Sequence, residues 1–163
     1  MSDGDPSEAA PPEIISSELV LRSQLFDVVD DRLRLADGRE IARISVVHPG
    51  AVAIVAIDDQ GRWLLVEQYR HGARKRLLEV PAGGREQGES PEATAAREIR
   101  EETGFAADSL VRLGGAWAAP ACLAGCMHDF RRTAVRALPP PPASERRHHA
   151  PLCSSHPEAF AAI

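Results

Sequence analysis

The chain has no long apolar run, no excess of positive charge and few cysteines. No apolar run approaches the about 20 residues that a membrane-spanning helix needs. The N-terminus is acidic and contains proline, unlike the basic and then apolar start of a secretory signal. The net charge is -5, with 24 acidic and 19 basic residues, which argues against nucleic acid as the main partner. We therefore expect a cytoplasmic protein that binds neither a membrane nor a nucleic acid.

The three cysteines, Cys122, Cys126 and Cys153, lie in the last third of the chain together with four of the six histidines. A zinc site built from Cys-x3-Cys-x-His and the later cysteine is one interpretation. Incidental thiols in a segment rich in proline, arginine and histidine are the other. The spacing matches no zinc finger or ribbon, and a reducing cytoplasm disfavours disulfides.

The length of 163 residues and the hydrophobic content of 44% suit one globular core. Residues 1–13 hold almost no large apolar side chain and are expected to form a mobile tail. Residues 14–48 are expected to form an antiparallel β-meander, residues 49–137 the main domain, and residues 138–163 an irregular tail. In that last segment we find no helical or strand period.

Short strand patterns fill the first part of the chain, with a turn at Asp37-Gly38. They cover residues 19–21, 25–29, 32–35 and 41–47. In the main domain, the apolar run 51–57 and the returning segment 63–68 enclose a turn, which predicts a hairpin in the middle of a sheet. Residues 110–117 predict a further strand.

Residues 83–105 read Gly-x5-Glu-x7-Arg-Glu-Ile-x-Glu-Glu-x-Gly-Phe, a loop followed by a helix. Ser90 is the expected N-cap, Pro91 the first helical residue and Gly104 the stop, which predicts a helix over 91–103.

Glu98, Glu101 and Glu102 fall within an arc of about 100° on this helix. Like charges at this spacing oppose helix formation by about 0.2 to 0.5 kcal/mol per pair, so a cation is expected beside them. Arg97 is within reach of Glu101 and could hold its carboxylate. We expect the opposite side to pack on the core, through Ala95, Ala96, Ile99 and Thr103. A merely solvated acidic helix is the alternative, but it has no need of Gly83, Glu89 and Gly104 at fixed distances.

This pattern resembles the Nudix box of the Nudix hydrolase family. The resemblance implies an α/β fold, an α/β/α sandwich around a mixed sheet, and hydrolysis of nucleoside diphosphates linked to another group with Mg2+ or Mn2+. It implies that Glu98 and Glu102 are the principal metal ligands and Glu101 a further ligand or support. With Arg97 these form the catalytic group, while Glu89 and Arg97 stabilise the loop and helix.

Residues 78–84, with Glu-x-Pro-Ala-Gly, resemble the ADP-ribose pyrophosphatase branch of that family. The resemblance implies that the carbonyl of Ala82 completes the metal shell and that Glu79 contacts the substrate. Upstream, Gln-Tyr-Arg resembles the strand end whose arginine reaches the substrate in that branch, so Arg70 is a substrate contact or else an ordinary strand-end arginine. Pro120 lies near where the branch carries a proline.

The N-terminal meander of that branch pairs with a second subunit, which implies a homodimer with Phe26 and Arg43 as contacts to base or phosphate. The basic residues at 71–77 either attract an anionic substrate or form a solvated loop.

The last third departs from the branch. Only residues 127–130 resemble the strand expected after Pro120, and we expect the chain to be shortened or replaced there. The branch places another glutamate on a later loop to bind metal or activate water, and it cannot be identified here. Glu145 and Glu158 are the only late glutamates.

The sequence thus predicts metal-dependent hydrolysis of ADP-ribose, or a related nucleoside diphosphate sugar, to AMP and ribose 5-phosphate. One alternative is a module that binds nucleotide sugars without hydrolysis, which degenerate box carboxylates would mark. Another is an inactive fragment with an altered C-terminal end.

Overall fold

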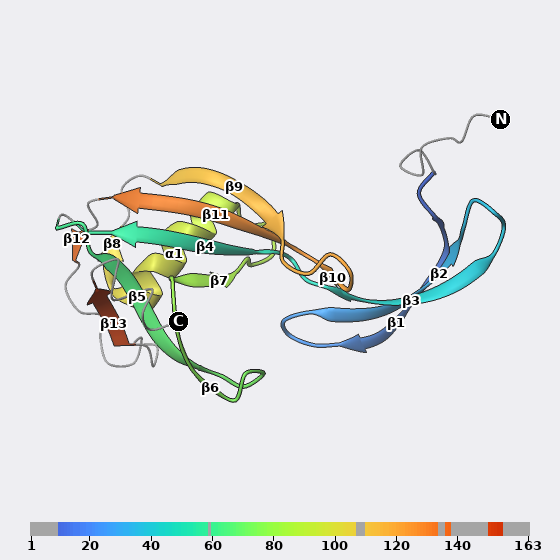
Figure 1. The fold of residues 1–163 in the computed structure, drawn as a ribbon, viewed down its shortest axis with the longest axis horizontal. Helices are drawn as coiled ribbons and strands as arrows, with labels where there is room; N and C mark the ends of the chain where they lie inside the picture. The colour runs from blue at the N-terminus through green and yellow to red at the C-terminus, as the bar shows by residue number, and fades with distance from the viewer. Residues whose placement is uncertain (1–9, 59, 107–109, 134–135, 138–149, 155–163) are drawn as a thin grey trace, which may run out of the picture. The chain divides into compact units, whose positions relative to one another are not determined.

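The computed structural model describes residues 10–58, 60–106, 110–133, 136–137 and 150–154. The chain divides into two compact units (Figure 1). The first comprises Met1–His48 and Ala119–Gly125, and the second comprises Pro49–Ala118 and Cys126–Ile163. Most of the tail predicted at the N-terminus, residues 1–9, lies outside the described residues.

The first unit is a sheet in which strands β1, β2 and β3 form an antiparallel meander. The short strand β10 adds to β3 in parallel. The predicted antiparallel N-terminal strands are therefore confirmed. Their bounds are β1 (Glu13–Arg22), β2 (Asp27–Arg34), β3 (Glu40–Val47) and β10 (Leu123–Ala124).

Two turns connect the meander. Gly38 has a φ of 85°, a conformation that glycine adopts without steric cost, and the predicted Asp37-Gly38 turn joins β2 to β3. The strand predicted at 25–29 is wrong at its first two residues. The Ser23 hydroxyl accepts hydrogen bonds from the N–H groups of Leu25 and Phe26 at 3.2 and 3.0 Å, and this local capping bends the chain before β2 begins.

The second unit contains a mixed sheet of seven strands, because β4 and β11 run parallel while the other pairs are antiparallel. The strand order is β13-β5-β4-β11-β9, with β6 on β5 and β7 on β4. A separate short pair joins β8 to β12. The bounds are β4 (Ala51–Ile57), β5 (Trp63–Arg70), β6 (Lys75–Glu79), β7 (Ala82–Gly84), β8 (Phe105–Ala106), β9 (Val111–Trp117), β11 (Cys126–Thr133), β12 (Arg136–Ala137) and β13 (Ala150–Ser154).

The hairpin of β4 and β5 lies in mid-sheet as predicted, with Ala56 opposite Leu64 and Ile57 opposite Trp63. The carboxylate of Asp58 holds its turn by accepting hydrogen bonds from the N–H of Arg62 at 2.8 Å and from its Nε at 2.7 Å.

Helix α1 (Pro91–Thr103) has the predicted bounds and caps. The Ser90 hydroxyl accepts a hydrogen bond from the N–H of Ala93 at 3.1 Å. At the other end Gly104 has a φ of 74°, and its N–H donates to the carbonyl of Arg100 at 2.9 Å.

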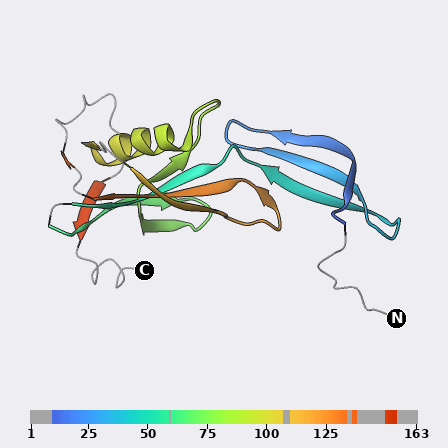
Figure 2. The ribbon, with the colours of Figure 1, turned by 90° about the horizontal axis from the view of Figure 1, so that it is seen from above.

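The core of the second unit forms where α1 lies along one face of the sheet (Figure 2). Among the described residues α1 is the one helix, so the α/β class and the mixed sheet are confirmed, and the second helical layer of the sandwich stays a prediction. Helix α1 is too short and too polar to cross a membrane.

The buried apolar core of this unit consists of Val52, Ile54, Ala56, Leu64, Ala95, Ile99 and Phe130.

Two strands come from the part of the chain that departs from the expected pattern. Strand β11 extends beyond the predicted residues 127–130 and lies between β4 and β9. Strand β13 falls in the segment expected to be irregular and pairs with β5 from Ala150–Glu67 to Ser154–Trp63. The strands pair through main-chain N–H and C=O groups. Because residues 150–154 show no alternation of apolar and polar residues, the sequence gives no sign of this strand.

Candidate active site

The segment between β6 and α1 is attached to the central strand β4. Strand β7 pairs with the first half of β4, with Ala82 opposite Ala53. On either side of β7, the N–H of Ile54 donates to the carbonyl of Pro81 at 2.9 Å and the N–H of Arg85 donates to the carbonyl of Gly50 at 3.0 Å. The loop that leads into the helix therefore starts from a fixed position on the sheet.

Two carboxylates of α1 reach consecutive residues of β7. Glu102 Oε2 accepts a hydrogen bond from the N–H of Ala82 at 2.9 Å. A Cβ atom at Gly83 would collide with the carboxyl group of Glu98, so only glycine leaves room for it. Glu98 is 2% exposed and Glu102 6% exposed. The strand thus brings two acidic groups together at one buried place.

The prediction that the acidic residues face away from the core is wrong for this pair. Ala95, Glu98, Ile99 and Glu102 follow the i, i+3, i+4, i+7 period of one helix face, and all four are buried. Ala96, which was expected to pack on the core, is exposed. The physical reason is that β7 lies against the same face, where the N–H of Ala82 donates to Glu102 and Gly83 leaves room for the carboxyl of Glu98.

Arg97 connects the acidic groups of the box. Its five N–H donors have five acceptors in three carboxylates and one carbonyl. They are both oxygens of Glu89 (3.0 and 2.9 Å), Oε1 of Glu98 (2.6 Å), Oε2 of Glu101 (3.3 Å) and the carbonyl of Gly84 (3.1 Å). The contact with Glu101 that the spacing predicts is present. One guanidinium thus places all these groups relative to one another.

Glu89 is the strongest partner of Arg97. Hydrogen bonds from Arg97 lower the pKa of the Glu89 carboxyl to about 2, helped by the N–H of Glu86 and the hydroxyl of Thr94. The same pairing raises the pKa of Arg97. Both side chains are only 16% exposed. The ion pair therefore stays charged throughout the physiological range.

Arg70 and Glu79 lie on the neighbouring strands β5 and β6. Arg70 Nη2 donates to Glu79 Oε2 at 2.6 Å, and its Nε lies 3.0 Å from both carboxylate oxygens. Gln68 Nε2 donates to Glu79 Oε2 at 3.2 Å. Hydrogen bonding to Glu79 raises the pKa of Arg70, and the charge of Glu102 adds to the effect. Arg70 is therefore close enough to Glu102 for the charge of that buried carboxylate to favour its protonated form.

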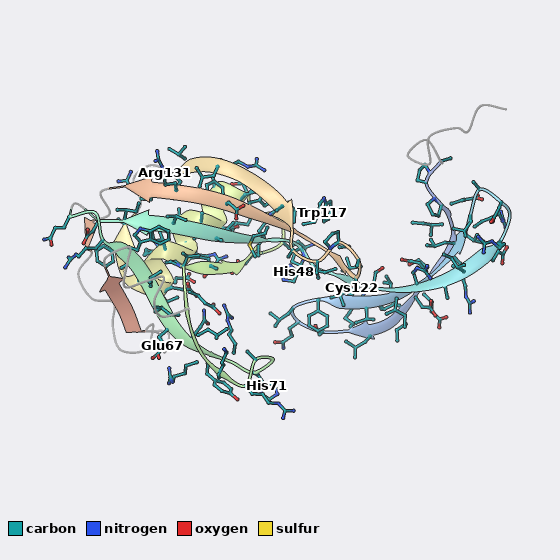
Figure 3. All side chains as sticks on the ribbon, viewed as in Figure 1. His48, Glu67, His71, Trp117, Cys122 and Arg131 are labelled. Atoms are coloured by element: carbon teal, nitrogen blue, oxygen red, sulfur yellow. The ribbon has the colours of Figure 1, made fainter. Side chains whose placement is uncertain are left out.

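Of the basic residues after Arg70, His71 and Arg74 lie in the exposed turn between β5 and β6, where Figure 3 labels His71, and Lys75 and Arg76 begin β6. The N–H of Arg74 donates to the carbonyl of His71 at 3.1 Å. Arg76 pairs with Glu67, also labelled in Figure 3, at 3.5 Å. Both interpretations of these charges stay open.

The remaining residues singled out in the sequence are Phe26, Arg43, Gly104, Glu145 and Glu158. Phe26 and Arg43 belong to the first unit, and their substrate role stays a prediction. Glu145 and Glu158 lie outside the described residues. Gly104 ends the helix, as predicted.

A metal site can be tested on the donor atoms. Among the described side chains, no three acidic, histidine or cysteine side chains, Glu98, Glu101 and Glu102 included, are grouped so that they could hold a metal ion. The zinc interpretation also uses Cys153, whose side chain lies outside the described ones. Magnesium, however, commonly takes one or two carboxylates, with the remaining ligands from water and substrate phosphates. Glu98 and Glu102, buried beside the main chain of Ala82 and Gly83, supply the hard oxygens that such an ion prefers. The donor set fits.

Comparison with known proteins agrees with this arrangement. A family model described as NUDIX domain matches residues 47–148, which is more than half of the chain. The chain belongs to the NUDIX domain family. The predicted resemblance is thereby confirmed at the level of the family.

Several relatives carry related names. The chain is 35% identical over 116 residues to the ADP-ribose pyrophosphatase of Bacillus subtilis, covering 71% of this chain and 63% of that protein. It is 47% identical over 98 residues to the ADP-ribose pyrophosphatase of Mycobacterium tuberculosis, covering 60% and 47%. The chain thus spans about half to two thirds of the length of these NUDIX relatives.

Among solved structures, a crystal structure of an ADP compounds hydrolase has a TM-score of 0.79 at 26% identity, and covers 95% of this chain and 85% of that chain. This likeness supports the α/β NUDIX fold.

Sequence reasoning missed three side chains at the site. Thr94 and Gln68 hydrogen-bond to Glu89 and Glu79, and Arg85 donates to the carbonyl of Glu89. Thr94 lies one turn after the loop, on the buried face of α1, and that helical position is a usable signal. Gln68 lies in the Gln-Tyr-Arg segment, of which only the arginine was assigned a role. Arg85 gives no signal, because an arginine in a loop is ordinarily solvated.

The low pKa of Glu89 predicts a loss of stability in acid. A carboxyl whose pKa falls from 4.5 to about 2 on folding contributes stability that is complete above pH 4.5. That contribution disappears as the pH falls through about 2. We expect Glu89→Gln to be less stable than the wild type at pH 7 by on the order of 1 to 2 kcal/mol, because solvent partly screens the pair.

Urea unfolding between pH 2 and pH 7 measures the effect. The difference between wild type and variant should shrink as the pH falls from 4.5 to 2. A difference that stays constant with pH would contradict the assignment of this pKa to the ion pair.

Proposed function

We propose that this chain hydrolyses the diphosphate of ADP-ribose, or of a related nucleoside diphosphate sugar, to AMP and ribose 5-phosphate. The observation that carries the proposal is a pair of buried carboxylates on α1. Glu102 lies against Ala82 of β7, and Glu98 lies against the next residue, Gly83. Groups as costly to bury as these need a compensating role or partner. The names of the relatives from B. subtilis and M. tuberculosis support the substrate class.

The proposed cofactor is Mg2+ or Mn2+. Glu98 and Glu102 would hold it, with the carbonyl of Ala82 and Glu101 as further ligand or support. When bound, such an ion neutralises charge on the diphosphate and lowers the pKa of an attacking water. The water loses a proton to solvent as its oxygen adds to one phosphorus, the bridging P–O bond breaks, and the leaving phosphomonoester keeps the bridging oxygen.

The other residues of the site position these groups. Arg97 holds Glu98 through Oε1 at 2.6 Å and Glu101 through Oε2 at 3.3 Å, and so sets the direction of both carboxylates. Arg70 and Glu79 form a polar pair at the strand ends that can bind the phosphate or ribose of the substrate. Phe26 and Arg43 are proposed as further contacts, and the cytoplasmic location stays a prediction.

Replacing one buried carboxylate tests its role in catalysis. We expect Glu102→Gln to lower kcat for ADP-ribose by about 100-fold or more, because a neutral amide is a poor ligand for a divalent ion. Release of AMP with Mg2+ or Mn2+, followed by ion-exchange chromatography, measures it. Glu92→Gln, the same change at an exposed position on the first turn of α1, is the matched control and should keep the wild-type rate.

Equal rates in the two variants would refute the role of Glu102. An inactive but folded wild type that still binds ADP-ribose would support the alternative of a binding module. An inactive wild type without a cooperative thermal melt would support the alternative of an inactive fragment.

The proposed partner is a second copy of this chain. All residues of β1 are exposed, and neighbouring residues of a strand point to opposite faces of the sheet. Large apolar side chains are therefore exposed on both faces of the first-unit sheet. Exposed apolar patches of this kind mark interaction surfaces. They include Ile14, Ile15, Leu19, Val20, Leu21, Leu25, Phe26, Ile44 and Val47.

The homodimer predicts twice the mass of one chain in size-exclusion chromatography with light scattering. Ile44, 62% exposed on β3, lies on this surface, and Ile44→Arg should give monomers. Leu113→Arg, at a residue of β9 that is 57% exposed, is the matched control and should stay dimeric. A monomeric wild type at micromolar concentration would overturn the proposal.

A further inference from the structure

Arg85 is the first residue after β7, and its side chain turns back onto the loop that it begins. Its Nη2 and Nε donate to the carbonyl of Glu89 at 2.7 and 3.2 Å, and its Nη1 donates to the carbonyl of Pro49 at 3.3 Å. The guanidinium therefore bridges the end of the loop and the residues just before β4.

The residues before β4 form a rigid support for this bridge. Gly50 has a φ of 97°, and a Cβ atom there would lie 3.0 Å from the carbonyl oxygen of Cys126 and 3.5 Å from Cδ of Arg85. The chain at Gly50 is thus held between β11 and the stem of Arg85. The N–H of Arg85 also donates to the carbonyl of Gly50 at 3.0 Å. Main chain and side chain of Arg85 both attach to this support.

Glu89 is consequently held from two directions. Arg85 binds its carbonyl, while Arg97 binds both oxygens of its carboxylate. Glu89 immediately precedes Ser90, the N-cap of α1. The residues between Arg85 and Glu89 are exposed, and Gly88 has a φ of 79°. Within the loop, the N–H of Glu89 donates to the carbonyl of Glu86 at 3.1 Å and the N–H of Glu86 donates to Glu89 Oε2 at 3.2 Å, so these bonds also depend on where Glu89 is held.

We infer that Arg85 is a positioning residue that fixes the loop 85–89 to the start of β4. Through Glu89 and Arg97 it fixes the direction of the Glu98 carboxylate. Lysine can replace it only in part, because one ammonium lacks the planar fork of the guanidinium that reaches two carbonyls. Its effect on the reaction rests on the proposed function, whereas its effect on the loop does not.

Hydrogen exchange tests the loop directly. In Arg85→Met we expect the hydrogen-bonded N–H groups of Glu86 and Glu89 to exchange at least about 10-fold faster than in the wild type, as local opening becomes easier. Arg85→Lys should give an intermediate rate. Arg62→Met is the matched control, since Arg62 also holds a turn, between β4 and β5, through Asp58. It should leave exchange at Glu86 and Glu89 unchanged.

Kinetics test the consequence for the reaction. Arg85→Met should lower kcat by about 10- to 100-fold, because small misplacements of catalytic groups have effects of that size. KM should stay within about 2-fold, since Arg85 is not assigned to the substrate. Arg62→Met should keep the wild-type kcat even if its melting temperature falls by as much as that of Arg85→Met.

Unchanged exchange at Glu86 and Glu89 in Arg85→Met overturns the inference, as does a kcat no lower than that of Arg62→Met. A wild type without hydrolase activity overturns the proposed function instead. In that case the exchange measurement still decides whether Arg85 fixes the loop.

Discussion

The structure around the Nudix box depends on the guanidinium of Arg97. Its planar fork of five donors is used completely, by three carboxylates and the carbonyl of Gly84. Without this cation, Glu89 and Glu98 would be acidic groups near each other with little solvent, and carboxylates in that situation repel and protonate. Arg97 therefore permits a concentration of negative charge of the kind that a divalent cation requires.

Fold and chemistry place opposite demands on the same helix face. A stripe of residues at the core period would be most stable if all were apolar, yet Glu98 and Glu102 occupy two of its positions beside Ala95 and Ile99. Burying carboxylates costs stability unless hydrogen bonds compensate. Here β7 supplies the N–H of Ala82 and the space at Gly83, while Arg97 supplies the charge. The short strand is thus as much a part of the site as the helix.

The sequence predicted the elements that neighbouring residues determine, namely the ends of α1 and the hairpin of β4 and β5. The bounds and caps of α1 followed from Ser90, Pro91 and Gly104, and the β4–β5 hairpin from two apolar runs around a turn. The burial of Glu98 was not predicted, because it depends on β7, which is close in space only after β4 has paired with it. For the same reason neither β13, which forms by main-chain pairing with β5, nor the bridge made by Arg85 could be read from residue type.

Arg97 holds the buried carboxylate of Glu98 and the neighbouring carboxylate of Glu101, and this arrangement is proposed to bind a divalent ion. Titration with Mn2+, followed by electron paramagnetic resonance of the free ion, tests this without substrate. The account predicts that the wild type binds Mn2+ and that Arg97→Lys, which loses the fork, binds it at least about 10-fold more weakly. Arg100→Lys, the same change at an exposed position of α1, should bind like the wild type. Equal Mn2+ affinity of the wild type and Arg97→Lys would contradict the account.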